Sequence, residues 1–105
     1  MHVRVYQPKE EALQEVHRII EEEGQNPTDE LLGAQYTLVF ETDEMNVPNA
    51  FADEDVLLDS VEAMVNLSQQ KLRPLGRYDV IDLSHKGQRR QILMFEDGEY
   101  EVIEV

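Results

Sequence analysis

The stretch RYDVIDLSHKGQRRQILMFEDGEYEVIEV, residues 77–105, decides the fold. Within it, two segments rich in apolar residues, 77–83 and 89–96, flank the short polar segment 84–87, an arrangement typical of two strands joined by a turn. An Asp-Gly pair, which favours a tight hairpin turn, then precedes a third strand-like segment at 100–105. The sequence therefore predicts three consecutive antiparallel strands.

Two amphipathic helices are predicted before residue 77. Apolar residues recur at i, i+1, i+4, i+7 and i+8 between Pro8 and Gly24, which is the spacing of a helix with one buried side. A second helix begins at Asp53, a favourable N-cap, and ends before Pro74. Its apolar side comprises Leu57, Leu58, Val61, Met64, Val65 and Leu67.

Three shorter segments complete the prediction. Residues 2–6 alternate apolar and polar side chains, which indicates a strand, and residues 35–42 are apolar on both faces, which indicates a central strand. Residues 26–33 predict a single helical turn. The order β-α-β-α-β-β-β predicts one α+β domain over residues 1–105, with two helices packed on one face of a mostly antiparallel five-stranded sheet.

The charge of the chain is unevenly distributed. The whole chain has a net charge of −14, to which residues 1–70 contribute −13, residues 71–90 +4 and residues 91–105 −5. Such an acidic field repels nucleic acid and anionic lipid and attracts basic protein surfaces. The acidity is also consistent with adaptation to high salt, which the low lysine content fits, and a solvated acidic surface with no binding role accounts for it at least as well as a binding function does.

Composition excludes or disfavours several classes of protein. The chain has no cysteine, so it has no disulfide framework and no cysteine-based zinc site. No apolar run approaches the ~20 residues that span a bilayer, and the N-terminus lacks the apolar core of a signal peptide. Neither glycine-rich phosphate-binding motif occurs. We therefore expect a cytoplasmic protein with no cofactor, no membrane partner and no nucleic-acid partner.

The sequence contains no recognisable catalytic or metal-binding constellation. His2, His17 and His85 have no metal-ligand spacing, and no serine lies in a G-x-S-x-G context. His17 lies at the edge of the apolar stripe of the first helix, which is typical of a structural histidine. The basic residues between 86 and 90 are interpreted as partners of the chain's own acids and as protection of a strand edge. We therefore predict a protein that is not an enzyme and has no metal site.

An acidic, partly apolar surface is the candidate site. The loop at residues 43–52 holds apolar side chains among acids, and it either covers the core or docks a partner. We expect a non-enzymatic interaction module that contacts a basic partner surface; in a sharper form it is a DNA mimic whose carboxylates replace phosphates. The alternatives are a small protein that forms homo-oligomers such as a homodimer, and an enzyme subunit. The expected partner-binding residues are Glu21, Glu22, Glu23, Asp43, Glu44, Met45, Val47, Phe51, Asp53, Glu54 and Asp55.

Three stretches and one turn resemble a known family. They are VRVYQ (residues 3–7), YTLVFE (36–41), GRYDVIDL (76–83) and the Asp-Gly pair at 97–98. In this order they resemble the YodL-like small proteins carried by conjugative elements and phages of Gram-positive bacteria. The chain lacks that family's Ser-Leu-Ser-Val-Ser run before Asp79 and its Asp-Ser-x-Gly-Phe signature. The resemblance implies a mobile-element or phage accessory protein and no catalytic residues.

Overall fold

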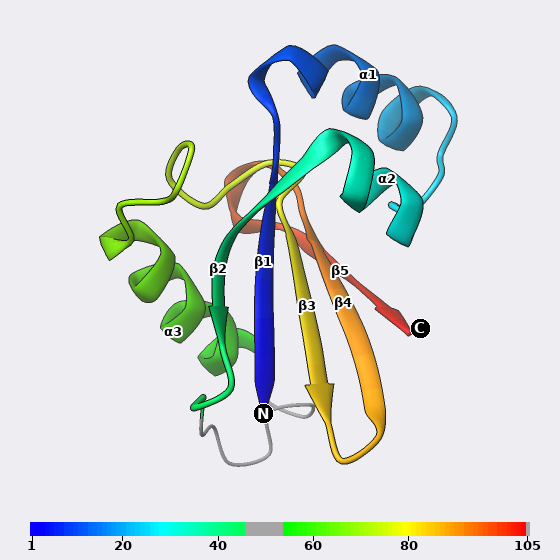
Figure 1. Ribbon diagram of the computed structural model, residues 1–105. Helices are drawn as coiled ribbons and strands as arrows, with labels where there is room; N and C mark the ends of the chain where they lie inside the picture. The colour runs from blue at the N-terminus through cyan, green and yellow to red at the C-terminus, as the bar shows by residue number, and fades with distance from the viewer. Residues whose placement is uncertain (46–53, 105) are drawn as a thin grey trace.

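Strands from both halves of the chain form one sheet in the order β2-β1-β3-β4-β5, and all neighbours are antiparallel (Figure 1). This computed structural model describes residues 1–45 and 54–104. The predicted α+β class and the five-stranded antiparallel sheet are confirmed for the described residues. The strands are β1 (His2–Pro8), β2 (Tyr36–Thr42), β3 (Val80–His85), β4 (Gln88–Met94) and β5 (Tyr100–Glu104).

The described residues form three α-helices, where the sequence predicted two. They are α1 (Leu13–His17), α2 (Asp29–Gln35) and α3 (Glu54–Leu67). The predicted first helix is less regular than expected, because a 3₁₀ turn (Glu10–Ala12) precedes α1 and a π turn (Arg18–Glu22) follows it. The amphipathic pattern therefore indicated a helical segment correctly, but not its changes in winding.

The additional helix, α2, occupies the region of the predicted single turn. Its N-terminus is capped by Thr28, whose Oγ1 accepts a hydrogen bond of 3.1 Å from the N–H of Leu31. The helix continues through Gly33, which costs about 1 kcal/mol relative to alanine. Burial of Leu32 in the core contributes more, about 1.5–3 kcal/mol. Packing therefore carries the helix past the glycine that was expected to end it.

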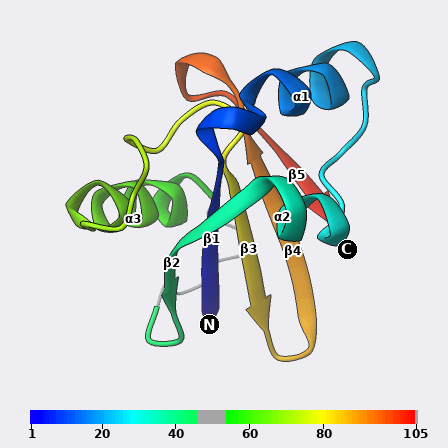
Figure 2. The same cartoon turned by 45° about the horizontal axis from the view of Figure 1, so that its top comes forward.

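The helices cover opposite faces of the sheet (Figures 1 and 2). Neighbouring residues of a strand point to opposite faces. Ile81 and Ile92 pack in one buried cluster with residues of α3, while Val80 and Leu93 pack in a second cluster with residues of α1 and α2. The prediction that the helices share one face is wrong, because β3 and β4 are apolar on both faces and both need cover.

β2 lies at an edge of the sheet, so the prediction of a central strand is wrong. Its residues Tyr36 and Val39 are buried, but Leu38 is 42% exposed. The pairing of β1 with β2 shifts between Val5 and Tyr6, and this shift leaves Val39 without an opposite residue on β1. The apolar residues of β2 thus include one that faces solvent.

The segment between α3 and β3 is held by Gln7 of β1. The fully buried Gln7 side chain donates to the carbonyl oxygen of Arg73 over 2.8 Å and to Oδ2 of Asp79 over 2.9 Å. It accepts hydrogen bonds from the backbone N–H groups of Leu72 (2.8 Å) and Arg73 (3.3 Å). All four hydrogen-bonding positions of the amide are used. α3 ends at Leu67, well before Pro74, and β3 begins at Val80 where residue 77 was predicted, so this irregular segment is longer than the sequence indicated.

The turn between β3 and β4 offers a stabilising substitution. Lys86 and Gly87 join the paired residues His85 and Gln88, and both have positive φ (50° and 80°), as in a type I′ turn. Asparagine adopts positive φ more readily than lysine does. We expect Lys86→Asn to raise the free energy of unfolding, measured by urea denaturation, by roughly 0.5 kcal/mol. Lys86→Ala removes the same charge without favouring positive φ, so an equal gain from both variants would show that the backbone conformation is not the cause.

Candidate functional site

The acids of the predicted site lie at two ends of the sheet. β1 and β2 are antiparallel neighbours of seven residues each, a length of about 20 Å. Asp43 and Glu44 follow β2 at the end where β1 begins. Glu21, Glu22 and Glu23 follow α1 beyond the end where β1 stops (Figure 1). The structure therefore divides the expected surface and does not bring these two groups together.

Met45 belongs to the core. Its side chain is 5% exposed and packs in the cluster that contains the buried residues of α3. The interpretation of the loop as a cover of the core is confirmed for Met45, and the expectation that Met45 contacts a partner is wrong. Val47, Phe51 and Asp53 lie outside the described residues. Glu54 is the first residue of α3.

Arginines of the basic segment neutralise acids from several elements. Arg77 Nη2 lies 3.7 Å from Glu21. Arg89 binds both Asp29 (2.8 Å) and the largely buried Asp82 (3.0 Å), and the guanidinium group holds the pKa of Asp29 below its usual range. The interpretation that basic residues near the β3–β4 turn pair with the chain's own acids is confirmed for Arg89. These paired acids are less available to an external partner.

α3 exposes apolar side chains next to its buried face. Val56, Met64 and Leu67 are 55%, 39% and 85% exposed. At 3.6 residues per turn, their spacing of eight and three positions places them on one side of the helix. The sequence prediction that Met64 and Leu67 belong to the buried side is wrong. We call these three residues the exposed apolar stripe.

An acidic stripe runs along the same helix. Asp55, Asp59 and Glu62 are exposed and recur at i, i+4 and i+7. α3 contains no basic residue. Within the part of the chain that the structure describes, no arginine, lysine or histidine forms an ion pair with these acids. Asp55 accepts a hydrogen bond of 2.8 Å from the hydroxyl of Tyr100. The exposed apolar stripe and this acidic stripe together form what we call the α3 outer face.

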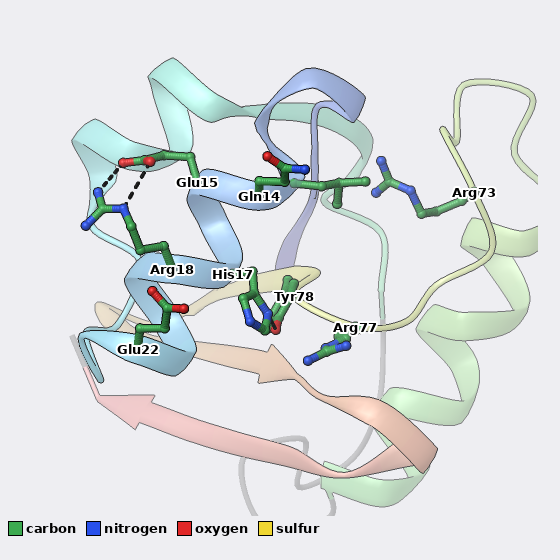
Figure 3. Close-up of a pocket in the computed structure, with 9 residues that line it drawn as sticks. Gln14, Glu15, His17, Arg18, Glu22, Arg73, Arg77 and Tyr78 are labelled. Atoms are coloured by element: carbon green, nitrogen blue, oxygen red, sulfur yellow. Dashed lines mark hydrogen bonds and ion pairs between the residues drawn. The ribbon is translucent and has the colours of Figure 1, made fainter.

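A pocket of about 720 Å³ lies between α1 and the segment that precedes β3 (Figure 3). Leu13, His17 and Arg18 line it from the helical segment, and Arg73 and Arg77 line it from the other side. Three of the six arginines of the chain therefore border one pocket.

Tyr78, which also lines this pocket, has an unusual backbone conformation. Its φ of 69° lies in the left-handed region that bulky residues seldom adopt. Its N–H donates to the carbonyl of Met94 over 2.7 Å, and its carbonyl accepts from the hydroxyl of Tyr36 over 2.8 Å. The Tyr78 hydroxyl donates to Glu21 over 3.3 Å and lies 2.6 Å from Nδ1 of His17. The tautomer of the His17 imidazole decides which of the two groups is the donor in the shorter bond.

The pocket could not be predicted from sequence spacing. His17 and Tyr78 are 61 positions apart, and the positive φ of Tyr78 has no counterpart in the local residue pattern. The basic character of residues 71–90 is the one signal in the sequence, and internal charge pairing accounts for it equally well. His17 does have a structural contact, as expected, but it also borders a pocket.

Comparisons with protein-family models, with curated proteins and with solved structures found no match to this chain. The resemblance to YodL-like proteins therefore remains a hypothesis. Among residues 1–45 and 54–104, no helix combines the length and apolar character needed to cross a membrane. The same residues contain no group of three His, Asp or Glu side chains arranged to hold a metal ion.

Proposed function

We propose that the protein is a non-enzymatic interaction module whose α3 outer face binds a basic, partly apolar segment of another protein. The observation that carries the proposal is the exposed apolar stripe beside an acidic stripe on a helix without a base. Burial of the apolar stripe supplies affinity. The acids raise the association rate with a basic partner and orient it.

The charge of the whole chain supports a basic partner. A net charge of −14 attracts positive surfaces over a longer range than the contact itself. A cytoplasmic mobile-element or phage accessory protein, and a DNA-mimic-like inhibitor as its sharper form, are proposed from this acidity and from the YodL-like resemblance. The α3 outer face favours a mixed apolar and ionic contact over a purely phosphate-like array, because Val56, Met64 and Leu67 lie beside its acids.

Loss of the exposed apolar stripe is expected to weaken partner binding. Val56→Ser/Leu67→Ser removes two apolar side chains, each of which contributes about 1.5–3 kcal/mol when buried. We therefore expect at least ~10-fold weaker binding. The probe is an amphipathic peptide with leucine and lysine at helical spacing, titrated by calorimetry. Leu38→Ser on β2 is the matched control, because Leu38 is also exposed but lies outside the α3 outer face.

Salt dependence separates the ionic contribution from the apolar one. Added salt weakens peptide binding by screening charge pairs. We expect this weakening to be smaller for Asp59→Asn/Glu62→Gln, because the variant forms fewer charge pairs with the peptide. Glu99→Gln/Glu101→Gln changes the net charge equally and should leave the salt dependence closer to that of the wild type. Equal effects of both pairs would argue against the α3 outer face.

Sedimentation of the same variants without peptide tests the homodimer alternative, in which α3 contacts a second copy.

A further inference from the structure

We propose that the pocket between α1 and the segment before β3 binds a small organic carboxylate with a compact apolar body. This pocket is separate from the α3 outer face, because α1 and α3 pack in the clusters on opposite faces of the sheet. The pocket volume of about 720 Å³ lies within the ~300–1,000 Å³ typical of ligand sites. It is far larger than the ~30 Å³ that one water molecule occupies, so a simple ion leaves most of it unfilled.

Cationic groups approach the pocket from different elements of an otherwise acidic chain. Figure 3 shows Arg73 on one side of the His17–Tyr78 pair and Arg18 on the other, where the Arg18 guanidinium is turned toward Glu15. The guanidinium of Arg77 lies 4.7 Å from the centre of the Tyr78 ring. Guanidinium groups bind carboxylates through two parallel hydrogen bonds, which gives both affinity and orientation. The arrangement therefore suits an oxyanion bound by Arg77 beside the Tyr78 ring, with Arg73 as a second cation of the pocket.

Arg73 and Arg77 each form an ion pair with an exposed glutamate that a ligand can replace. Arg73 Nη2 donates to the carbonyl of Pro8 (2.6 Å) and to the exposed Glu10 (3.3 Å). Its Nη1 atom is buried from solvent and has no hydrogen-bond partner among the described residues, so a ligand would exchange with Glu10 at Nη2. Arg77 binds Glu96 over 2.6 Å and lies 3.7 Å from Glu21. The side chains of Glu10 and Glu96 are 71% and 66% exposed, and such exposed ion pairs contribute little stability. A ligand carboxylate held by several donors at once can therefore replace the carboxylates of Glu10 and Glu96.

Other residues of the pocket narrow the class of ligand. Leu13 and the alkyl chains of the arginines provide an apolar wall. The strained backbone of Tyr78 is of the kind found at binding sites. Glu15 and Glu22 also line the pocket, and their charges oppose a second negative charge on the ligand. A singly charged carboxylate is therefore expected to bind more tightly than a phosphate monoester.

The first test is an NMR titration of the isotope-labelled full chain with four probes. Benzoate is expected to cause saturable shifts that centre on residues 13–18 and 73–78, and acetate to bind more weakly. Benzyl alcohol, which has a similar shape without the charge, is expected to give no saturable shift. The proposal is overturned if benzoate does not bind, if benzyl alcohol binds equally well, or if phenyl phosphate binds more tightly than benzoate.

The second test compares two arginine substitutions. Arg77→Gln is expected to weaken benzoate binding about 10-fold or more, whereas Arg4→Gln should leave it unchanged. The two are well matched, because each arginine binds a surface glutamate and their side chains are 40% and 45% exposed. Equal affinities in both variants overturn the proposal. Benzoate binding to Arg18→Gln tests a second residue of the pocket. None of these three arginine variants should change the affinity of the α3 outer face for the peptide.

Discussion

Replacing Gln7 with alanine is expected to lower the free energy of unfolding by about 3–5 kcal/mol. Without the Gln7 amide, the backbone groups of Leu72 and Arg73 and one oxygen of Asp79 lose hydrogen bonds inside the protein. A polar group that loses its partner costs about 1–3 kcal/mol where it is buried; the Leu72 and Arg73 groups are part-buried, and Oδ2 of Asp79 keeps the hydrogen bond from Gly76. Small domains have a total stability of about 5–15 kcal/mol. Much of the stability therefore depends on this one side chain, and urea denaturation followed by circular dichroism measures it.

Two further variants separate hydrogen bonding from packing at Gln7. Gln7→Leu fills a similar volume but cannot form the hydrogen bonds, so it is expected to be nearly as unstable as Gln7→Ala. Gln14→Ala removes an exposed glutamine from α1 and should stay within about 0.5 kcal/mol of the wild type. A Gln7→Leu variant as stable as the wild type would show that the four hydrogen bonds contribute little.

The contacts of Gln7 also show which parts of the fold the sequence could predict. The three C-terminal strands and α3 follow local patterns: alternation, turn residues and helical spacing. Gln7 and Asp79, in contrast, are 72 positions apart, and no local pattern indicates that they meet. Their contact and the hydrogen bonds to residues 72–73 hold the segment before β3 in an irregular conformation. The end of α3 and the start of β3 therefore differ from their predicted positions.

Apolar residues on both faces of a strand do indicate a central strand, but the sequence prediction applied this criterion to β2 and not to β3 and β4. β3 contains Val80 next to Ile81, and β4 contains Ile92 next to Leu93, so each places large apolar side chains on both faces. Contiguous apolar residues of this kind require cover on both faces of a sheet. The same reasoning, applied to β2, led to the wrong central position, because Leu38 is exposed there. If the same criterion is applied to β3 and β4, it predicts helices on opposite faces of the sheet.

The chemistry of the candidate site was easier to predict than its position. The net charge indicated an acidic surface, and Asp55 was among the expected residues. Composition does not reveal which acids are already paired: Glu23 forms an ion pair with Arg18, and Glu21 lies beside Arg77. α3 stands apart because its sequence holds several acids and no base. Ion pairing, which composition does not reveal, therefore moves the candidate surface to α3.

Stability is expected to decrease as the pH rises from about 4 to about 7, because of Asp79. Burial raises the pKa of its carboxyl group from 3.8 to about 7, although hydrogen bonds from Gln7 and Gly76 and the charge of Arg73 oppose this shift. Those two hydrogen bonds, of 2.9 Å and 2.8 Å, both reach Oδ2. Oδ1 is buried and has no hydrogen-bond partner among the described residues. The charged form of Asp79 is therefore poorly compensated in the folded state.

The direction of the pH effect follows from proton binding. Between the two pKa values, Asp79 is protonated in the folded state and ionised in the unfolded state. The folded state binds more protons, so the free energy of unfolding falls with rising pH. Each unit of pKa difference corresponds to about 1.4 kcal/mol, and the total therefore reaches several kcal/mol. The stabilisation is complete below the unfolded pKa and is lost as the pH passes the folded pKa of about 7.

Asp79→Asn isolates this contribution from that of the other acids. Repulsion among the other acids changes with pH in both proteins, so it largely cancels in the difference between variant and wild type. The asparagine carbonyl can accept the hydrogen bonds from Gln7 and Gly76, and it does not ionise. We expect the free energy of unfolding of Asp79→Asn, relative to wild type, to rise by several kcal/mol between about pH 4 and pH 8. Parallel stability curves over this range would contradict the assignment to Asp79. In a Gln7→Leu background the advantage of asparagine at pH 8 should grow, because the Asp79 carboxylate then loses one of its two hydrogen-bond donors.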